Sequence, residues 1–331
     1  MKLFEKKKFP NGKREIYFLN RPLFHYKKRL SAYDKIYAKR FTGLTEKEAR
    51  FILRHQFKHM MGRSLNLDNP QTFNEKIQWM KLYCRDPRMT LCADKYKVRD
   101  YIKQQIGEKY LTPLLGVYDN AEEIDFDKLP NRFVAKVNWG SGQNIICTDK
   151  TQLDIAEVKR KLNMWMQPHS NHYYNLLEWV YKDIEPKIII EEYLESLSHG
   201  ALDYKFMCFN GKPYYIWVSN KYLSVQERSF YDLDWNMLDM ELVEPHKIKA
   251  PKPAPRPDNL LEMIELARKL CQGFAHVRVD LYKLDDGTIK FGELTFSTSS
   301  GYSPWSPKEV DKKLGDLLDL NLIKKDVSSW A

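Results

Sequence analysis

The stretch "HVRVDLYKLDDGTIKFGELTF", residues 276–296, predicts a β-hairpin. Apolar and polar residues alternate on both sides of Asp286-Gly287, a pair that favours a two-residue hairpin turn. Because successive side chains of a strand point to opposite faces, one face of this hairpin is apolar and the other is polar. The apolar face belongs to a buried core, and the polar face carries the residues whose chemistry needs an explanation.

Two acidic residues are predicted to face each other on the polar side of the hairpin. The turn pairs Asp280 with Glu293, and Arg278 with Thr295. Directly opposed side chains have Cβ atoms about 4.5–5.5 Å apart, and like charges placed so are destabilising. A divalent cation such as Mg²⁺, shared with a phosphate, would compensate the two carboxylates. Three alternatives remain. Arg278 could compensate the two charges, the acids could share a proton, or the face could be solvated so that the repulsion is weak.

A glycine-containing loop joins two predicted strands in "AKVNWGSGQNI", residues 135–145. No helix follows Gly140-Ser141-Gly142, so the loop is neither a dinucleotide-binding fingerprint nor a Walker A loop. Its small residues would let backbone N–H groups approach a phosphate closely. Lys136 lies in an apolar strand just before the loop and needs an anionic partner, which a phosphate would supply. An ordinary hairpin turn and an edge-strand lysine remain the alternatives.

The composition indicates a soluble protein of about two domains. The chain has 331 residues, and no apolar run approaches the roughly 18 residues of a membrane span. The N-terminus lacks the apolar region of a signal peptide, so we expect a cytoplasmic location. The five cysteines are scattered without a CxxC pair, which argues against a zinc site or a disulfide framework and favours buried free thiols.

The net charge of +10 is concentrated at the N-terminus. Residues 1–63 contain 18 Lys/Arg and 5 Asp/Glu, whereas the remaining residues contain 36 and 39. Such a basic segment with interleaved aromatic residues suits an anionic membrane surface, and it also suits RNA or a solvated helical face. We expect residues 1–60 to make peripheral contact with an anionic membrane, and we consider nucleic acid the weaker alternative.

The order of predicted elements is that of an α+β protein. Apolar residues at helical spacing predict helices over 45–61, 72–83, 93–106, 154–166 and 260–271. Alternating or β-branched stretches predict strands in "RFVAKVNW", "IICT" and "KIIIEEYL", and a second hairpin turns at Asn210-Gly211. Antiparallel hairpins with helices packed against them therefore form the core.

The chain resembles the ATP-grasp superfamily, and more closely the teichuronopeptide-biosynthesis-like (TupA-like) ATP-grasp proteins of bacterial polysaccharide gene clusters. The resemblance spans residues 69–318 and rests on "NPQTFNEKIQWMKLY", "ADKYKVRDYI", "YLTPLLGVYDN", "FVAKVNWGSGQNII", "IIIEEYL", "DYKFMCFNGKP", "FYDLDWN" and "VRVDLY…FGELTF". It implies two α+β subdomains that clamp a nucleotide. The expected division is a basic, largely helical segment (1–68), an N-terminal lobe (69–130), a small subdomain with the glycine flap (131–200) and a C-terminal subdomain with the hairpin (201–331).

The resemblance also implies roles for individual residues. The implied nucleotide-binding residues are Lys95, Lys136, Asn138, Gly140, Ser141, Gly142, Gln143, Glu191, Glu192, Leu194 and Asp203. Among them the two lysines contact phosphates, the glycine loop covers the phosphates, residues 191–194 read adenine and the aspartate binds ribose. The implied metal ligands are Asp280, Glu293 and Thr295, and the implied catalytic residues are Arg278, near the developing oxyanion, and Lys205, near the phosphates.

The sequence departs from the family pattern at two positions. Thr295 stands where many ATP-grasp ligases have asparagine, and relatives with "REW" have an arginine where this chain has Leu177.

The activity implied by the resemblance is ATP-dependent carboxylate–amine ligation with Mg²⁺. A carboxylate would be phosphorylated to an acylphosphate, which an amine would then attack. The family setting suggests a hexuronic-acid-type sugar carboxylate and an amino acid or other amine, in the synthesis of capsule, lipopolysaccharide O-antigen or a related surface polysaccharide. A kinase that acts on a sugar hydroxyl and a non-catalytic protein that binds glycan or membrane are the alternatives.

Overall fold

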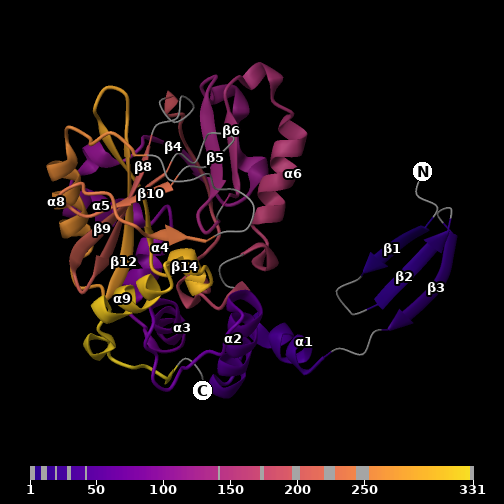
Figure 1. The fold of residues 1–331 in the computed structure, drawn as a ribbon. Helices are drawn as coiled ribbons and strands as arrows, with labels where there is room; N and C mark the ends of the chain where they lie inside the picture. Colours follow the sequence, from indigo (N-terminus) through magenta and orange to yellow (C-terminus); the bar gives the residue numbers. More distant parts are fainter. Residues whose placement is uncertain are drawn as a thin grey trace.

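A computed structural model describes the protein over residues 4–8, 13–18, 21–27, 31–41, 43–140, 142–171, 175–195, 202–219, 228–243 and 253–328. Two antiparallel sheets with helices packed against them make up its main body, which confirms the predicted α+β class (Figure 1). Within the described ranges, no helix has the length and apolar character that crossing a membrane requires.

The larger sheet has five strands in the order β10-β9-β8-β12-β13. The strands are β8 (Asp203–Phe209), β9 (Lys212–Ser219), β10 (Arg228–Tyr231), β12 (His276–Lys283) and β13 (Ile289–Thr295). The predicted hairpin at Asn210-Gly211 is confirmed, since both residues have positive φ and join β8 to β9. Helix α8 (Leu260–Leu270) packs on the apolar face of this sheet. A short pair, β11 (Glu241–Leu242) with β14 (Trp305–Ser306), lies beside it.

The smaller sheet has four strands in the order β4-β7-β5-β6. The strands are β4 (Leu114–Tyr118), β5 (Phe133–Val137), β6 (Asn144–Cys147) and β7 (Ile188–Glu192). Helix α6 (Ile155–Trp165) packs against β5, so α8 and α6 lie on the outer sides of the two sheets (Figure 1). Strand β4 precedes residue 131, so this sheet takes one strand from the predicted N-terminal lobe.

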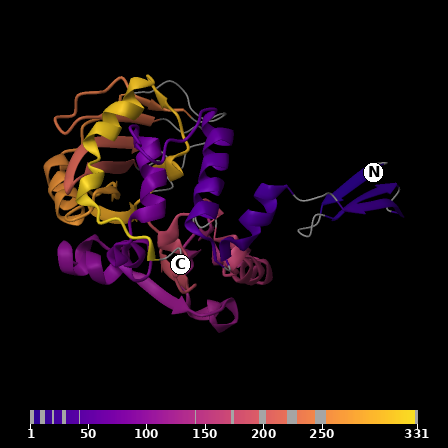
Figure 2. The same cartoon turned by 90° about the horizontal axis from the view of Figure 1, so that it is seen from below.

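The described part of the body also contains α3 (Phe73–Tyr83), α4 (Pro87–Ala93), α5 (Val98–Gln105) and α9 (Glu309–Leu317). Helices α3 and α9 lie side by side (Figure 2). The helix predicted over 93–106 is confirmed from Val98 to Gln105, but it does not begin at residue 93. The Asp94 carboxylate accepts the backbone N–H groups of Tyr96 and Lys97, and this local bonding competes with helical bonding. The break leaves Lys95 between the ends of α4 and α5.

The N-terminal segment is only partly helical. Strands β1 (Phe4–Lys8), β2 (Lys13–Phe18) and β3 (Arg21–Lys27) form an antiparallel sheet, which differs from the predicted largely helical segment. Helices α1 (Ala32–Tyr37) and α2 (Glu46–Met61) follow. Thr45 and Glu48 form a capping box at the start of α2, and the helix predicted over 45–61 is confirmed. Aromatic residues recur in the first 27 positions and favour strands.

The hairpin β12–β13 differs from prediction in its loop length and in a β-bulge, and the two differences have opposite effects on the strand register. Its loop has three residues, because the N–H of Leu284 donates to the carbonyl of Thr288. A β-bulge then lies beside Asp280, where Gly292 is the extra residue of β13. A Cβ at Gly292 would lie 3.1 Å from the Asp280 carbonyl oxygen, so the close approach favours glycine. The bulge restores the predicted register of Asp280 opposite Glu293.

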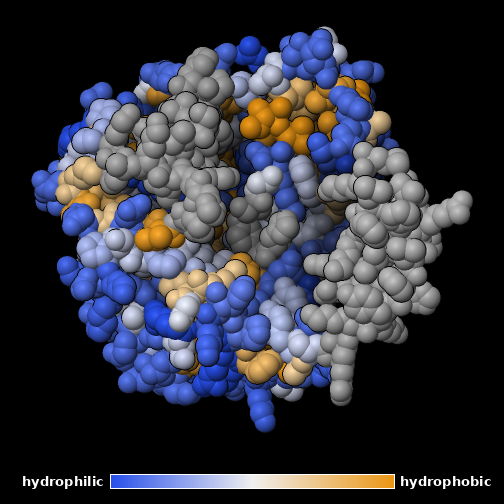
Figure 3. All heavy atoms as spheres, turned by 45° about the vertical axis from the view of Figure 1, so that its right-hand side comes forward, coloured by the Kyte–Doolittle hydropathy of each residue, from blue (hydrophilic) through white to orange (hydrophobic). Residues whose placement is uncertain are grey.

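One hydrophobic core joins both sheets, and a smaller cluster packs α1 and α2 against the body. All five cysteines are buried and free, as expected. In the view of Figure 3 the surface is mostly hydrophilic, with hydrophobic residues gathered in a patch near the top.

A buried histidine in this core makes stability depend on pH. His276 is fully buried, with Nδ1 2.9 Å from the carbonyl oxygen of Cys208 and Nε2 3.1 Å from the hydroxyl of Thr298. Because a carbonyl oxygen only accepts, Nδ1 carries the proton and Nε2 accepts from Thr298. Burial lowers the pKa of His276 to about 3, so the folded protein holds this ring neutral.

We therefore expect acid to destabilise the protein through His276. The unfolded chain binds a proton near pH 6.5 and the folded protein does not, so stability is complete above that pH and falls toward pH 3. Between pH 6.5 and 5 the loss should be about 2 kcal/mol. Urea unfolding at several pH values should show a shallower acid dependence in His276→Asn than in the wild type or in the exposed control His59→Asn. Parallel slopes in all three proteins would contradict this expectation.

Candidate active site

A cavity of about 470 Å³ lies between the smaller sheet, β13 and the α4–α5 segment. Several predicted site residues line it: Lys95, Lys136, Gly140, Gly142, Gln143, Glu191, Glu192, Leu194 and Glu293. Ser141 was also predicted and falls outside the described residues. The structure thus brings together the glycine loop, two lysines and the end of β7, which are far apart in the sequence.

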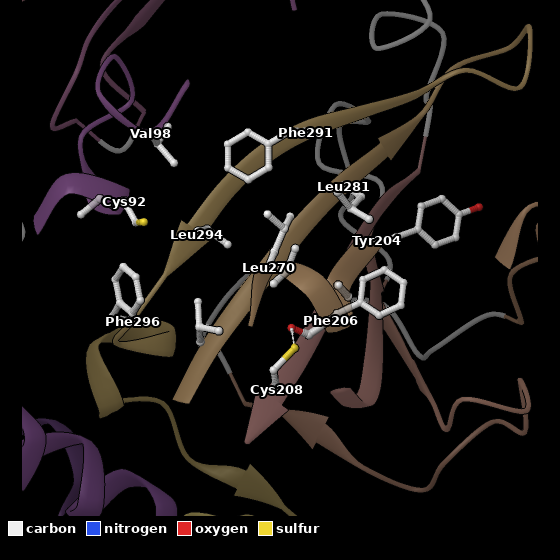
Figure 4. Packing of buried hydrophobic residues seen from close by; sticks show 14 of the residues in the cluster. Cys92, Val98, Tyr204, Phe206, Cys208, Leu270, Leu281, Phe291, Leu294 and Phe296 are labelled. Atoms are coloured by element: carbon white, nitrogen blue, oxygen red, sulfur yellow. Dashed lines mark hydrogen bonds between the residues drawn. The ribbon is translucent and has the colours of Figure 1, made fainter. Parts of the chain in front are cut away.

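Apolar residues form part of the cavity lining. Val98 of α5 and Cys92 of α4 lie beside Phe291 and Leu294 of β13, as Figure 4 shows. Ile146 of β6 adds an apolar group from the smaller sheet. Apolar walls with a few placed polar groups are typical of small-molecule sites, and they suit a flat ring.

Three charged side chains meet in the same cavity. Glu191 Oε2 lies 2.5 Å from Lys136 Nζ, and Glu191 Oε1 lies 3.1 Å from a guanidinium nitrogen of Arg99. The lysine of the apolar strand therefore has a carboxylate as its partner within the chain. Arg99 was not predicted, because a contact between residues 99 and 191 leaves no local pattern in the sequence.

Lys95 connects the α4–α5 break to the glycine loop. Its Nζ donates to the carbonyl of Gly140 at 2.7 Å, and its backbone N–H donates to Asn138 at 3.0 Å. A Cβ at Gly140 would lie 2.7 Å from Gln143 Cβ and 2.9 Å from Val137 Cγ2, so this close turn favours glycine. The loop is thereby held against the cavity with Lys95 at its edge.

A cluster of alternating charges lies next to the cavity on the face of the larger sheet. Arg278 Nε and Nη2 donate to the two oxygens of Asp280 at 2.7 Å each, and Nη2 also donates to Glu293 at 2.8 Å. Lys205 Nζ lies 2.7 Å from Asp280 and also pairs with Asp203. Glu293 belongs to both the cluster and the cavity, so it connects the two.

The two cations of the cluster stay charged despite burial. Burial disfavours the charged form of Arg278, but Asp280 and then Glu293 outweigh it, so the pKa of Arg278 is raised. Burial likewise opposes the charge of Lys205, and Asp203 with Asp280 raises the pKa of that ammonium group overall. Asp280 is 1% exposed, so its carboxylate is not part of a solvated face. Two cations compensate the opposed acids within the chain.

The oxygen ligands present suit a hard cation, although no full metal site exists within the described chain. In the described ranges, no three His, Cys, Asp or Glu residues are grouped to hold a metal ion. Mg²⁺ commonly takes one or two carboxylates and completes its shell with phosphates and water. Asp280 and Glu293 offer two carboxylates, and the hydroxyl of Thr295 lies 3.0 Å from Glu293 Oε1. This donor set fits Mg²⁺ shared with a phosphate.

Some predicted residues lie outside the cavity lining. Asn138 is fully buried, donates to the carbonyl of Glu185 and accepts the N–H of Lys187, so its side chain fixes the backbone between the loop and β7. The structure places Asp203, also fully buried, beside Lys205 in the charge cluster.

Sequence reasoning also missed a buried pair beside the end of β13. Lys81 Nζ donates to the carbonyl of Ser300 at 2.7 Å, and Glu178 Oε1 accepts from the Ser300 hydroxyl. Burial lowers the pKa of Lys81 and raises that of Glu178, both to about 7. Ser299 and Ser300 have positive φ, so the turn that follows β13 is strained where this pair holds it. Leu177, next to Glu178, has positive φ as well.

The sequence between residues 75 and 319 matches a family described as TupA-like ATP-grasp, which confirms the resemblance and the fold. The chain belongs to the TupA-like ATP-grasp family. The matched range includes the cavity, the charge cluster and the hairpin, whereas α1, α2 and the preceding strands lie before it.

Solved structures of a synthetase and of two ligases are similar to this family member at low identity. N5-carboxyaminoimidazole synthetase from Staphylococcus aureus with ADP matches at 13% identity over 62% of this chain and 44% of its own, with a TM-score of 0.36. D-alanine–D-alanine ligase from Bacillus anthracis with ATP matches at 17% identity over 69% and 65%, with a TM-score of 0.37. L-amino acid ligase from Bacillus licheniformis matches at 16% identity over 86% and 62%, with a TM-score of 0.44.

The chain thus spans less than two thirds of each of these three proteins, and less than half of the first. No curated protein matches the sequence closely enough to count as a relative.

Proposed function

We propose that the protein is an ATP-dependent carboxylate–amine ligase that forms an amide through an acylphosphate. The observation that carries the proposal is the junction at Glu293, where a cation-bearing cavity meets the cluster of Arg278, Asp280 and Lys205. Family membership supports ATP as the nucleotide. ATP would occupy the cavity, and its reacting end would lie at this junction.

The nucleotide is held by groups of two kinds. The base packs on the apolar lining that includes Val98 and Phe291, and it meets the acidic end of β7, Glu191 to Leu194. The phosphates interact with Lys95, Lys136 and the backbone N–H groups of the glycine loop, because closely placed cations and amides stabilise their negative charge. Lys205, already paired with two aspartates, supplies positive charge from the sheet face.

Asp280, Glu293 and Thr295 would hold Mg²⁺, which when bound neutralises phosphate charge and favours phosphoryl transfer. Arg278 orients both carboxylates through its hydrogen bonds. The glycine loop, held by Lys95, excludes water that would otherwise hydrolyse an acylphosphate. Arg278 also stabilises the oxyanion that forms when the amine attacks.

The proposed acceptor is a sugar carboxylate of the hexuronic-acid type, and the proposed amine is an amino acid. The protein would then act in the synthesis of a cell-surface polysaccharide. The description of the family as TupA-like supports this substrate class. A kinase would instead need a base for a sugar hydroxyl, for which "FYDLDWN" offers Asp232 and Asp234. Asp232 accepts the N–H groups of Asp234 and Asn236 within its own turn. Because these hydrogen bonds already occupy the Asp232 carboxylate, they favour the ligase over the kinase.

Trapping with hydroxylamine tests the ligase. With a uronic acid, Mg²⁺ and ATP, we expect a hydroxamate to accumulate together with equal amounts of ADP and phosphate, because a carboxylate accepts an amine only after its oxygen becomes a leaving group. Screening uronic acids against amino acids identifies the natural pair. A stable phosphorylated sugar without free phosphate would indicate the kinase, and no nucleotide binding at all would indicate a non-catalytic glycan-binding protein.

We also propose that residues 1–60 hold the enzyme at an anionic membrane, where lipid-linked glycans are built. The excess of basic residues in that segment supports this, at about 1 kcal/mol per Lys or Arg near such a surface. Sedimentation with anionic vesicles should show binding at low salt that weakens sharply as salt rises. Absence of binding at low salt would remove the membrane role and leave the ligase untouched.

A further inference from the structure

We infer that Arg99 is a positioning residue that makes the nucleotide site selective for a base with an exocyclic amino group. This inference rests on the proposed binding of ATP. Arg99 is not among the site residues that the resemblance implies. Its position between the two sheets suggests the role.

Arg99 bridges the two parts of the molecule that enclose the cavity. It is the second residue of α5, and α5 is tied to the larger sheet's side by the Tyr101 hydroxyl, which donates to Leu270 at the end of α8. The Arg99 guanidinium crosses to the smaller sheet's side. It donates to the carbonyl of Thr112, before β4, at 2.8 Å and to Glu191 of β7 at 3.1 Å.

The two oxygens of Glu191 are divided between two cations. Oε1 is held by Arg99 and Oε2 by Lys136, and the Arg99 and Glu191 side chains are only 15% and 12% exposed. Lys136 is 23% exposed and has a four-carbon flexible stem, whereas the guanidinium is fixed by its second bond to Thr112. Of the two cations bound to Glu191, Lys136 can therefore move away from the carboxylate, whereas Arg99 remains bound to it.

Nucleotide binding redistributes these bonds. A phosphate competes for Lys136, and release of Lys136 frees Glu191 Oε2 at the cavity surface. Because Arg99 retains Oε1, the carboxylate keeps its orientation instead of following Lys136. A fixed carboxylate accepts a hydrogen bond from the amino group of adenine, and it opposes the ring carbonyl oxygen of hypoxanthine, which is also an acceptor. A site built around one hydrogen bond discriminates strongly against an analogue that lacks its partner.

Calorimetric titration of the full chain with ATP and with ITP tests this role. We expect the wild type to prefer ATP at least about tenfold. Arg99→Met should lose most of that preference, with a loss of ATP affinity of about tenfold and a much smaller loss for ITP. Lys103→Met is the matched control, since it removes a cation of the same helix whose side chain is 57% exposed outside the cavity lining. Its ATP-to-ITP ratio should equal that of the wild type.

A second variant covers the case in which Arg99→Met fails to fold. Arg99→Lys keeps the charge, but one ammonium cannot bridge Thr112 and Glu191 as the planar fork does, so the ATP-to-ITP ratio should fall again. An unchanged ratio in either folded variant, or equal losses for both nucleotides, would overturn the inference and assign Arg99 to general attraction of phosphate. A wild type that binds no nucleotide would instead reject the proposed function, so the two failures are distinguishable.

Discussion

Glu293→Gln should lower Mg²⁺-dependent turnover by about 10³-fold or more while leaving the protein folded, because a catalytic metal contributes several kcal/mol to the transition state. The side chain of Glu293 is 34% exposed and is held by Arg278 at 2.8 Å and by the Thr295 hydroxyl at 3.0 Å. A glutamine oxygen can accept both hydrogen bonds, so the substitution removes the charge and keeps the local geometry. Arg278 retains Asp280 as a charged partner.

The experiment measures ADP release over a range of Mg²⁺ concentrations, with thermal unfolding as the check on folding. Glu265→Gln is the matched control, since this glutamate lies on the exposed side of α8 in an ion pair with Arg268. The control should keep wild-type turnover and Mg²⁺ dependence. If Glu293→Gln did so as well, the paired acids would hold no metal and would serve only to fix Arg278.

Asp280→Asn is a poorer test of the same idea because of where the structure places Asp280. This carboxylate is 1% exposed and accepts from both Arg278 and Lys205. Removal of one member of such a buried network leaves unpaired charge and costs about 3–5 kcal/mol. The variant should therefore lose stability as well as activity, and only Glu293→Gln separates the two effects.

The hairpin shows how much the sequence could predict. Alternation of apolar and polar residues was enough to place Asp280 opposite Glu293, because the period of a strand assigns each residue to a face. The turn length was wrong by one residue, and the bulge at Gly292 corrected it. A glycine inside a strand is a known sign of a bulge, so both features could have been expected together.

The parts that sequence reasoning missed are contacts between distant residues. Arg99 of α5 meets Glu191 of β7, and Lys81 of α3 meets the turn at Ser300, so each contact joins elements far apart in the sequence. Neither contact produces a periodicity or a characteristic residue spacing in the sequence. Each is fixed by how separate elements pack, which a single sequence does not reveal.

Arg278→Lys should lower the rate of the chemical step by about 10²–10³-fold, the usual effect of losing one well-placed oxyanion donor. Nε and Nη2 of Arg278 are committed to Asp280 and Glu293. The third nitrogen, Nη1, donates to no residue in the part of the chain that the structure describes, so it is the donor that can face a developing negative charge. The guanidinium also lies 5.4 Å from the centre of the Trp217 ring, which limits its movement.

A lysine keeps the positive charge but cannot hold two oxygens of Asp280, reach Glu293 and leave a further fixed donor. Single-turnover hydroxamate formation should therefore slow while the affinity for ATP changes by only a few-fold. Arg228→Lys is the matched control, since Arg228 also lies over Trp217, at 4.9 Å, but on the edge strand β10. An equal loss in both variants would point to packing around Trp217, whereas a loss confined to Arg278→Lys assigns the oxyanion to the arginine that the paired acids hold in place.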